Sequence, residues 1–121
     1  MLDSLRDRAI QLLLEAVTCT LATSGPAGVQ ASTIDCKGKD TELILFIPNT
    51  SDHLFNLEHE PEVALATKHW NLQATTQILG NATEIFNELE VQWHIAVKVI
   101  PRQMHILPDE TVNHPQTIDF Y

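Results

Sequence analysis

Residues 43–67 read LILFIPNTSDHLFNLEHEPEVALAT, and this stretch predicts a strand, a short helix and a second strand. The apolar run at its start has the length of a buried strand, and it ends at Pro48, which has no N–H for a strand ladder. Asn49, Thr50, Ser51 and Asp52 can each cap the start of a helix through a side-chain oxygen. Leu57 belongs to an apolar helical face, and Pro61 requires the helix to stop near residue 60. The predicted helix start is therefore a candidate anion site as well as an ordinary cap.

Length and composition are those of one globular domain over residues 1–121. The chain is 44% hydrophobic and 19% charged, which is ordinary for a soluble protein. No apolar run approaches the ~20 residues of a membrane-spanning helix. The N-terminal sequence MLDSLRDR is amphipathic and lacks the basic-then-apolar layout of a signal peptide. We therefore expect a cytoplasmic protein with no membrane partner.

The charge balance argues against a nucleic-acid partner. Seven Lys and Arg residues face sixteen Asp and Glu residues, for a formal net charge of −9. Nucleic-acid binding needs clustered cations that displace counterions from phosphates, and the cations here are scattered. Cys19 and Cys36 form neither a CxxC nor a zinc pattern, so we expect two small buried thiols.

The rest of the chain predicts short, mostly antiparallel strands with few helices. Gly80 marks a candidate bulge, Pro101 and Pro108 should each end a strand, and residues 87–93 could be a helix or a wide turn. The pattern predicts a mainly β, α+β chain that closes into a small antiparallel barrel with helices at its ends. The predicted elements are a helix over 3–16, strands over 17–23, 29–35, 72–86, 95–100, 103–107 and 116–121, polar turns over 25–28 and 37–40, and a loop over 109–115.

No catalytic set is visible in the sequence. None of the six histidines stands at metal-ligand spacing, so no metal site is predicted. The chain also lacks a phosphate-cradling glycine loop and a marked nucleophile–base pair. Whether the protein is an enzyme therefore stays open at this stage, and its catalytic residues are unknown.

The order of these pieces resembles the pyridoxamine 5'-phosphate oxidase-like, FMN-binding split-barrel family. The likeness covers most of the chain, and the order and spacing of the motifs carry it more than any motif alone. In chain order the motifs are TCTLATSGPAG at 18–28, S-x-H-x-x-N-L at 51–57 with Pro61 and VAL at 63–65, QILGNA at 77–82, VKVIP at 97–101 and MHI at 104–106.

The resemblance implies an antiparallel split β-barrel that forms a homodimer and holds FMN at the interface between subunits. It implies an oxidoreductase-like function in which the flavin supplies the redox chemistry. The cofactor-binding residues that it implies are Ser32, Thr33 and Ile34 along the flavin ring, Thr50, Ser51 and His53 at the phosphate, and Thr75 where the family often has Gln against the ring.

The sequence departs from the family at the phosphate site. No Lys or Arg occurs between Lys39 and Lys68, so Arg102 or Lys98 of the partner subunit is a candidate substitute. His53 stands where the family has Lys, and its usual pKa of ~6.5 predicts tighter FMN binding as pH falls from about 8 to 6. One alternative is a cofactor-free split-barrel module for binding or sensing that has lost the phosphate grip, and a third option is a barrel that binds haem in place of flavin.

Overall fold

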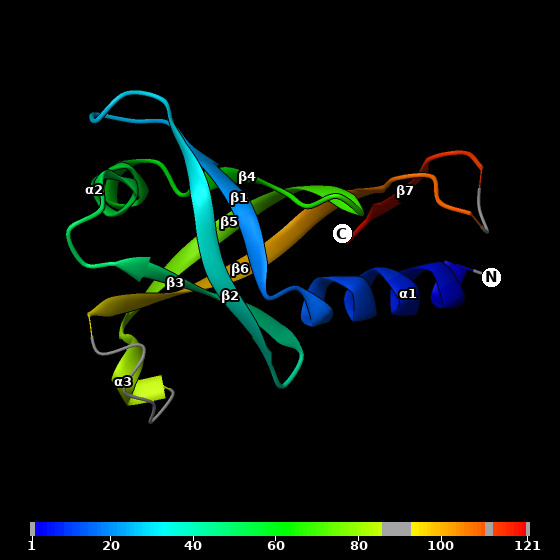
Figure 1. The fold of residues 1–121 in the computed structure, drawn as a ribbon, viewed down its shortest axis with the longest axis horizontal. Helices are drawn as coiled ribbons and strands as arrows, with labels where there is room; N and C mark the ends of the chain where they lie inside the picture. Colours follow the sequence, from blue (N-terminus) through cyan, green and yellow to red (C-terminus); the bar gives the residue numbers. More distant parts are fainter. Residues whose placement is uncertain (1, 86–92, 111–112, 121) are drawn as a thin grey trace.

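The computed structural model describes residues 2–85, 93–110 and 113–120. About half of the described residues lie in antiparallel strands, with a helix before the first strand and another between β3 and β4 (Figure 1). The elements are α1 (Leu2–Glu15), β1 (Thr18–Thr23), β2 (Gln30–Lys39), β3 (Glu42–Pro48), α2 (Asp52–His59), β4 (Glu62–Ala66), β5 (Trp70–Asn81), α3 (Ala82–Ile85), β6 (His94–Ile106) and β7 (Gln116–Asp119).

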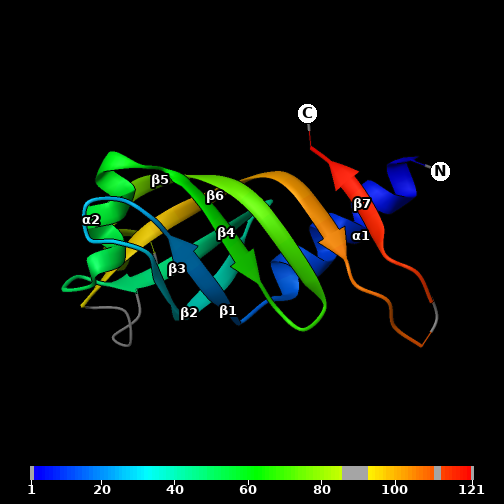
Figure 2. The same cartoon turned by 90° about the horizontal axis from the view of Figure 1, so that it is seen from above.

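Six of the strands close into a barrel, as the sequence predicted. The sheet order is β3-β2-β1-β4-β5-β6-β7, and an additional pairing between β3 and β6 closes the ring. Every pairing is antiparallel, and β7 extends the sheet beyond β6. Both views place α2 at one end of the barrel, together with the loop that joins β1 to β2, and α1 at the other end near β7 (Figures 1 and 2).

The core fills the barrel from alternate positions on every strand. Leu21, Leu45, Leu65 and Trp70 are at most 1% exposed, and they belong to one continuous cluster. Leu57 of α2 is 4% exposed and joins the same cluster, so the predicted apolar face of this helix packs as expected. Burying these side chains supplies the main driving force for closing the barrel.

The predicted polar turn over residues 37–40 is wrong. β2 continues to Lys39, and the chain turns at residues 40–41, where Asp40 has a φ of 57°. Gly38 explains the difference, because a Cβ atom there would lie 2.7 Å from the backbone oxygen of Leu14. The glycine therefore serves the close approach of α1 to β2, and its backbone stays in the strand.

Two strand ends also differ from the prediction. The strand predicted over 72–86 ends at Asn81, and residues 82–85 form the short helix α3. The two strands predicted around Pro101 are one strand, because β5 pairs with β6 on both sides of this proline. On the other edge of β6, Pro101 falls between Val99, the last residue paired with β3, and Gln103, the first paired with β7. Gly80 stands at a register shift, as predicted, whereas residues 87–92 of the ambiguous segment lie outside the described residues.

Candidate functional site

The structure selects one of the four predicted cap residues at the start of α2. Ser51 is the N-cap, and its Oγ accepts a hydrogen bond of 3.1 Å from the backbone N–H of His53. Asp52 lies in the first turn, where a carboxylate interacts favourably with the helix dipole. At the other end, the Glu60 N–H donates to the Asn56 carbonyl, and the helix ends just before Pro61.

Asn56 ties α2 to the loop between β1 and β2. Its side chain is completely buried, and Oδ1 accepts from the Ala27 N–H at 2.9 Å. Nδ2 donates to the Gly28 carbonyl at 2.8 Å and to Thr23 Oγ1 at 3.1 Å. A backbone N–H can only donate and a carbonyl can only accept, so these partners fix which end of the amide is oxygen. Gly25 lies directly against the amide, because a Cβ there would be 2.9 Å from Asn56 Oδ1.

His53 is buried beside Asn56, and both of its ring nitrogens have partners. Nδ1 lies 2.8 Å from Thr23 Oγ1, and Nε2 lies 2.7 Å from Ser32 Oγ. Burial lowers the pKa of His53, and the nearby Asp52 carboxylate opposes this shift. The imidazole is therefore neutral at neutral pH. The tighter binding expected between pH 8 and 6 from its charge does not follow from this geometry.

A small cavity of about 200 Å³ opens beside Ser32 and the start of α2. Ser32, Thr33 and Ile34 of β2 line it together with Ser51, so four of the seven predicted cofactor-binding residues meet at one place. The remaining lining residues are Asp35, Phe46, Pro48 and His94. Because Ser32 and Ser51 belong to this lining, we call the cavity the Ser32 pocket.

The other predicted residues lie at different depths around the Ser32 pocket. His53 stands behind Ser32 and outside the lining, and Thr50 lies in the exposed turn before α2. Thr75 lies on β5, where its hydroxyl donates to Glu62 Oε1 at 3.2 Å, and it is not part of the lining. Sequence reasoning did not identify Thr23, whose contribution depends on contacts between distant segments.

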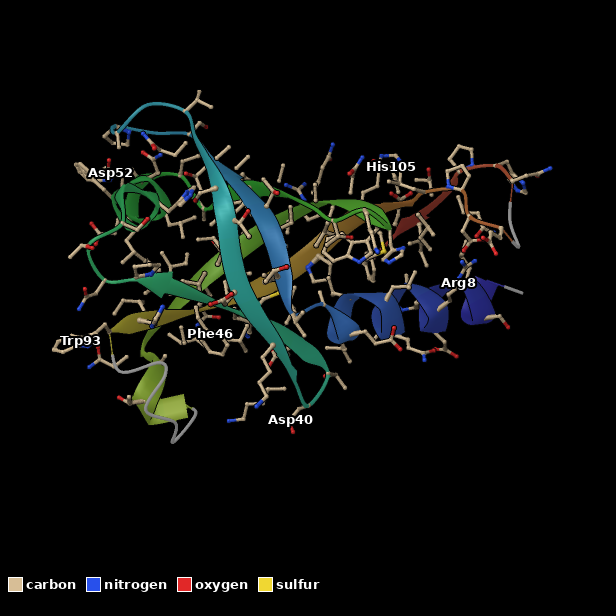
Figure 3. The ribbon with its side chains drawn as sticks, viewed as in Figure 1. Arg8, Asp40, Phe46, Asp52, Trp93 and His105 are labelled. Atoms are coloured by element: carbon tan, nitrogen blue, oxygen red, sulfur yellow. The ribbon has the colours of Figure 1, made fainter. Side chains whose placement is uncertain are left out.

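His94 brings an unpaired polar atom to the pocket. Its Nδ1 is buried and has no hydrogen-bond partner within the described part of the chain. A buried polar atom without a partner costs free energy unless water or a ligand satisfies it. Figure 3 places the neighbouring Trp93 and Asp52 at the same end of the barrel, with Arg8 and His105 toward the other end.

The electrostatics of the pocket lack a cation. Among the described residues, no Lys or Arg lines it, whereas Asp35 does. The two cations that the sequence offered as substitutes both have partners in their own chain: Lys98 is 3.2 Å from Glu42, and Arg102 binds both carboxylate oxygens of Glu62 at 2.8 and 2.9 Å. The side-chain donors among these lining residues are therefore mainly hydroxyl groups beside the start of α2, where the His53 and Leu54 N–H groups already donate to Ser51.

A second surface feature runs along the outer face of β1 and β4. Thr20 pairs with Ala66 and Ala22 with Ala64, so four small side chains share one exposed or half-buried patch. Cavities of about 460 and 360 Å³ lie over this patch. Thr33 lines the larger of these cavities as well as the Ser32 pocket, so the two features adjoin.

Neither a protein-family model nor a curated protein matches the chain. Solved structures do match. ChuZ from Campylobacter jejuni superposes with a TM-score of 0.72 at 14% identity, over 98% of this chain and 60% of its own. A candidate pyridoxamine 5'-phosphate oxidase from Listeria innocua gives 0.64 at 12% identity, over 85% of this chain and 98% of its own. An F420 reductase superposes with a TM-score of 0.61 at 15% identity, over 78% of this chain and 93% of its own.

The chain has the pyridoxamine 5'-phosphate oxidase-like split-barrel fold. This split barrel spans less than two thirds of ChuZ, and at these identities the likeness concerns the fold alone. Within the described residues, no group of His, Cys, Asp and Glu could hold a metal ion, and no helix is long and apolar enough to cross a membrane. Cys19 and Cys36 are free, buried thiols, as predicted, and their mutual hydrogen bond raises the pKa of Cys36.

Proposed function

We propose that this split barrel is a flavin-binding protein with an oxidoreductase-like role, and that FMN is its cofactor. The observation that carries the proposal is the meeting of Ser32, Thr33, Ile34 and Ser51 at one pocket beside the start of α2. These four positions are among those that the resemblance to the family implies for the cofactor. Proteins that share the fold include one named as an F420 reductase.

The donor set at the pocket suits an oxygen acceptor. Ser51 and Ser32 each hold one hydroxyl hydrogen, and they lie beside the positive end of the α2 dipole, where the His53 and Leu54 N–H groups already donate to Ser51. The two hydroxyl groups would hold the phosphate, while the backbone of Thr33 and Ile34 would lie along the ring. The bound flavin would supply the redox chemistry, and the protein would supply position and polarity. Asp35 opposes a dianion, so we expect modest affinity.

The proposed site is completed by a second copy of the chain. The small side chains of β1 and β4 leave a shallow face beside the Ser32 pocket, and Val17 and Val29 are 73% and 83% exposed. Covering such a face with a partner subunit would bury apolar area and enclose a planar ring. Sedimentation at micromolar concentration should therefore give a dimer mass. A clean monomer would remove the two-chain site on which the flavin proposal depends.

One observation favours a second candidate function. The pocket lining includes a carboxylate and no cation, which is the reverse of a phosphate site. A cofactor-free binding or sensor module with this fold would have no need of a phosphate grip. Such a protein would be colourless when purified and would not respond to added FMN.

Flavin titrations separate the two candidates. Flavin fluorescence should be quenched as the protein is added, and FMN should bind more tightly than riboflavin, which lacks the phosphate. Ser51→Ala should weaken FMN binding by about fivefold, because one hydroxyl donor is lost. Equal affinity for FMN and riboflavin would show that the phosphate does not sit at α2. If neither flavin binds, the cofactor-free module is the better account.

A further inference from the structure

We propose that His53 is a positioning residue that holds Ser32 and Ser51 as hydrogen-bond donors toward an oxygen acceptor in the Ser32 pocket. This inference rests on the proposed function and deepens it, because it assigns a role to a buried residue that does not line the pocket. Four side chains carry it, Asn56, Thr23, His53 and Ser32, which form one continuous chain of hydrogen bonds.

The Asn56 amide determines which group donates in each hydrogen bond of that chain. The Ala27 N–H and the Gly28 carbonyl fix the orientation of the amide, so Nδ2 must donate to Thr23 Oγ1. Thr23 is 3% exposed and has one hydroxyl hydrogen of its own. The other hydrogen-bond partner of that hydroxyl in the described residues is His53 Nδ1, at 2.8 Å. If Thr23 did not donate to Nδ1, its hydrogen would be buried without an acceptor, which costs free energy.

The neutral imidazole accepts a hydrogen bond from Thr23 and donates one to Ser32 at the pocket. With Nδ1 accepting from Thr23, the single ring proton resides on Nε2 and is donated to Ser32 Oγ at 2.7 Å. The hydroxyl hydrogen of Ser32 is then free for a group in the pocket. The backbone N–H of the same histidine donates to Ser51 Oγ, which leaves the Ser51 hydrogen free in the same way. Each bond in such a chain polarises the next.

The ligand chemistry follows from this arrangement. A pocket with two outward hydroxyl hydrogens recognises a group that accepts hydrogen bonds, such as a phosphate or carbonyl oxygen, and disfavours a donor group. The role does not require a charged His53, because Nε2 donates to Ser32 in both the neutral and the protonated ring. The relay therefore differs from a direct contact between a cationic side chain and a phosphate.

The ring proton can be located without any ligand. Nitrogen-15 NMR of the histidine rings at pH 7.5 should find His53 with Nε2 protonated and Nδ1 unprotonated. Thr23→Val, which removes the hydroxyl at little change of shape, should abolish this preference. The matched control is Thr117→Val, because Thr117 Oγ1 and His105 Nδ1 form an exposed pair of the same kind at 2.9 Å, remote from the pocket. A ring protonated at Nδ1 in the wild-type protein would overturn the relay.

The second arm measures FMN binding in the same variants. Ser32→Ala and Thr23→Val should each weaken FMN by about three- to tenfold, the size expected for one hydrogen bond, while Thr117→Val should stay within twofold. Circular dichroism melts establish that each variant is folded. An unchanged affinity in folded Thr23→Val would overturn the positioning role, even if FMN binds well to the wild type. If the wild type binds no flavin, the proposed function fails, and the His53 ring proton alone decides the relay.

Discussion

Asn56→Ala should cost more stability than truncating a surface asparagine. The side chain is completely buried and makes three hydrogen bonds, one from the Ala27 N–H, one to the Gly28 carbonyl and one to Thr23 Oγ1. At about 1 kcal/mol for each bond the sum is ~3 kcal/mol. In the variant, water can bind the Ala27 N–H and the Gly28 carbonyl, which lowers this sum. The Thr23 hydroxyl is buried and loses its hydrogen bond from Asn56 without replacement, so we expect a loss of about 2–3 kcal/mol.

Urea unfolding measures this loss directly. The midpoint should fall while the slope with urea concentration stays constant, because the surface exposed on unfolding is the same. Asn71→Ala is the matched control, since Asn71 is an exposed asparagine of β5, and it should change stability by less than about 0.5 kcal/mol. Amide hydrogen exchange at Ala27 should also become faster in Asn56→Ala. A loss below about 0.5 kcal/mol would refute the assignment of Asn56 as the anchor of the loop.

Further predictions concern the helix face, the buried histidine and the closest approach of α1. Leu57→Ala should lose ~2–5 kcal/mol in the same unfolding assay, because the side chain is in the core, and a loss under about 0.5 kcal/mol would show that the helix face is misassigned. Burial lowers the pKa of His53, and the Asp52 carboxylate only partly opposes this shift. The unfolded chain therefore binds more protons at this histidine than the folded protein does, and the free energy of unfolding should fall as pH drops below ~6.5. His53→Gln should remove this part of the pH dependence of stability. A wild-type protein that His53 makes more stable on acidification would contradict the neutral imidazole. Gly38→Ala should cost ~1–3 kcal/mol because the added Cβ would lie 2.7 Å from the Leu14 oxygen, and an unchanged melting temperature would mean that α1 moves away without cost.

Local chemistry made part of this structure predictable from sequence. Ser51 and Pro61 set the two ends of α2 through a side-chain cap and a backbone restriction, and both act within a few residues. The order of the strand motifs was sufficient to predict the antiparallel barrel. Pro101 shows the limit of this reasoning. A proline interrupts a strand only where a partner needs its N–H, and the pairings with β3 and β7 leave a gap at that residue.

The resemblance named residues that meet in the structure, but it did not reveal their hydrogen bonding. Ser32 and Ser51 line one pocket, and their role in cofactor binding stays a prediction. His53 was expected to face the phosphate as a cation, and it is instead buried against Thr23. The burial of His53 and the direction of its hydrogen bonds depend on how the β1–β2 loop, β2 and α2 pack together. A local sequence pattern therefore cannot predict them.

The most direct test of the central claim is to locate a flavin on the folded protein. Backbone amide NMR spectra recorded during a titration with FMN would report which residues sense the ligand. The account predicts that the largest shifts occur at Ser32, Thr33 and Ile34 and at the start of α2, with little change at Thr117 on the far strand. Shifts confined to the opposite end of the barrel, or no shifts at saturating FMN, would contradict it.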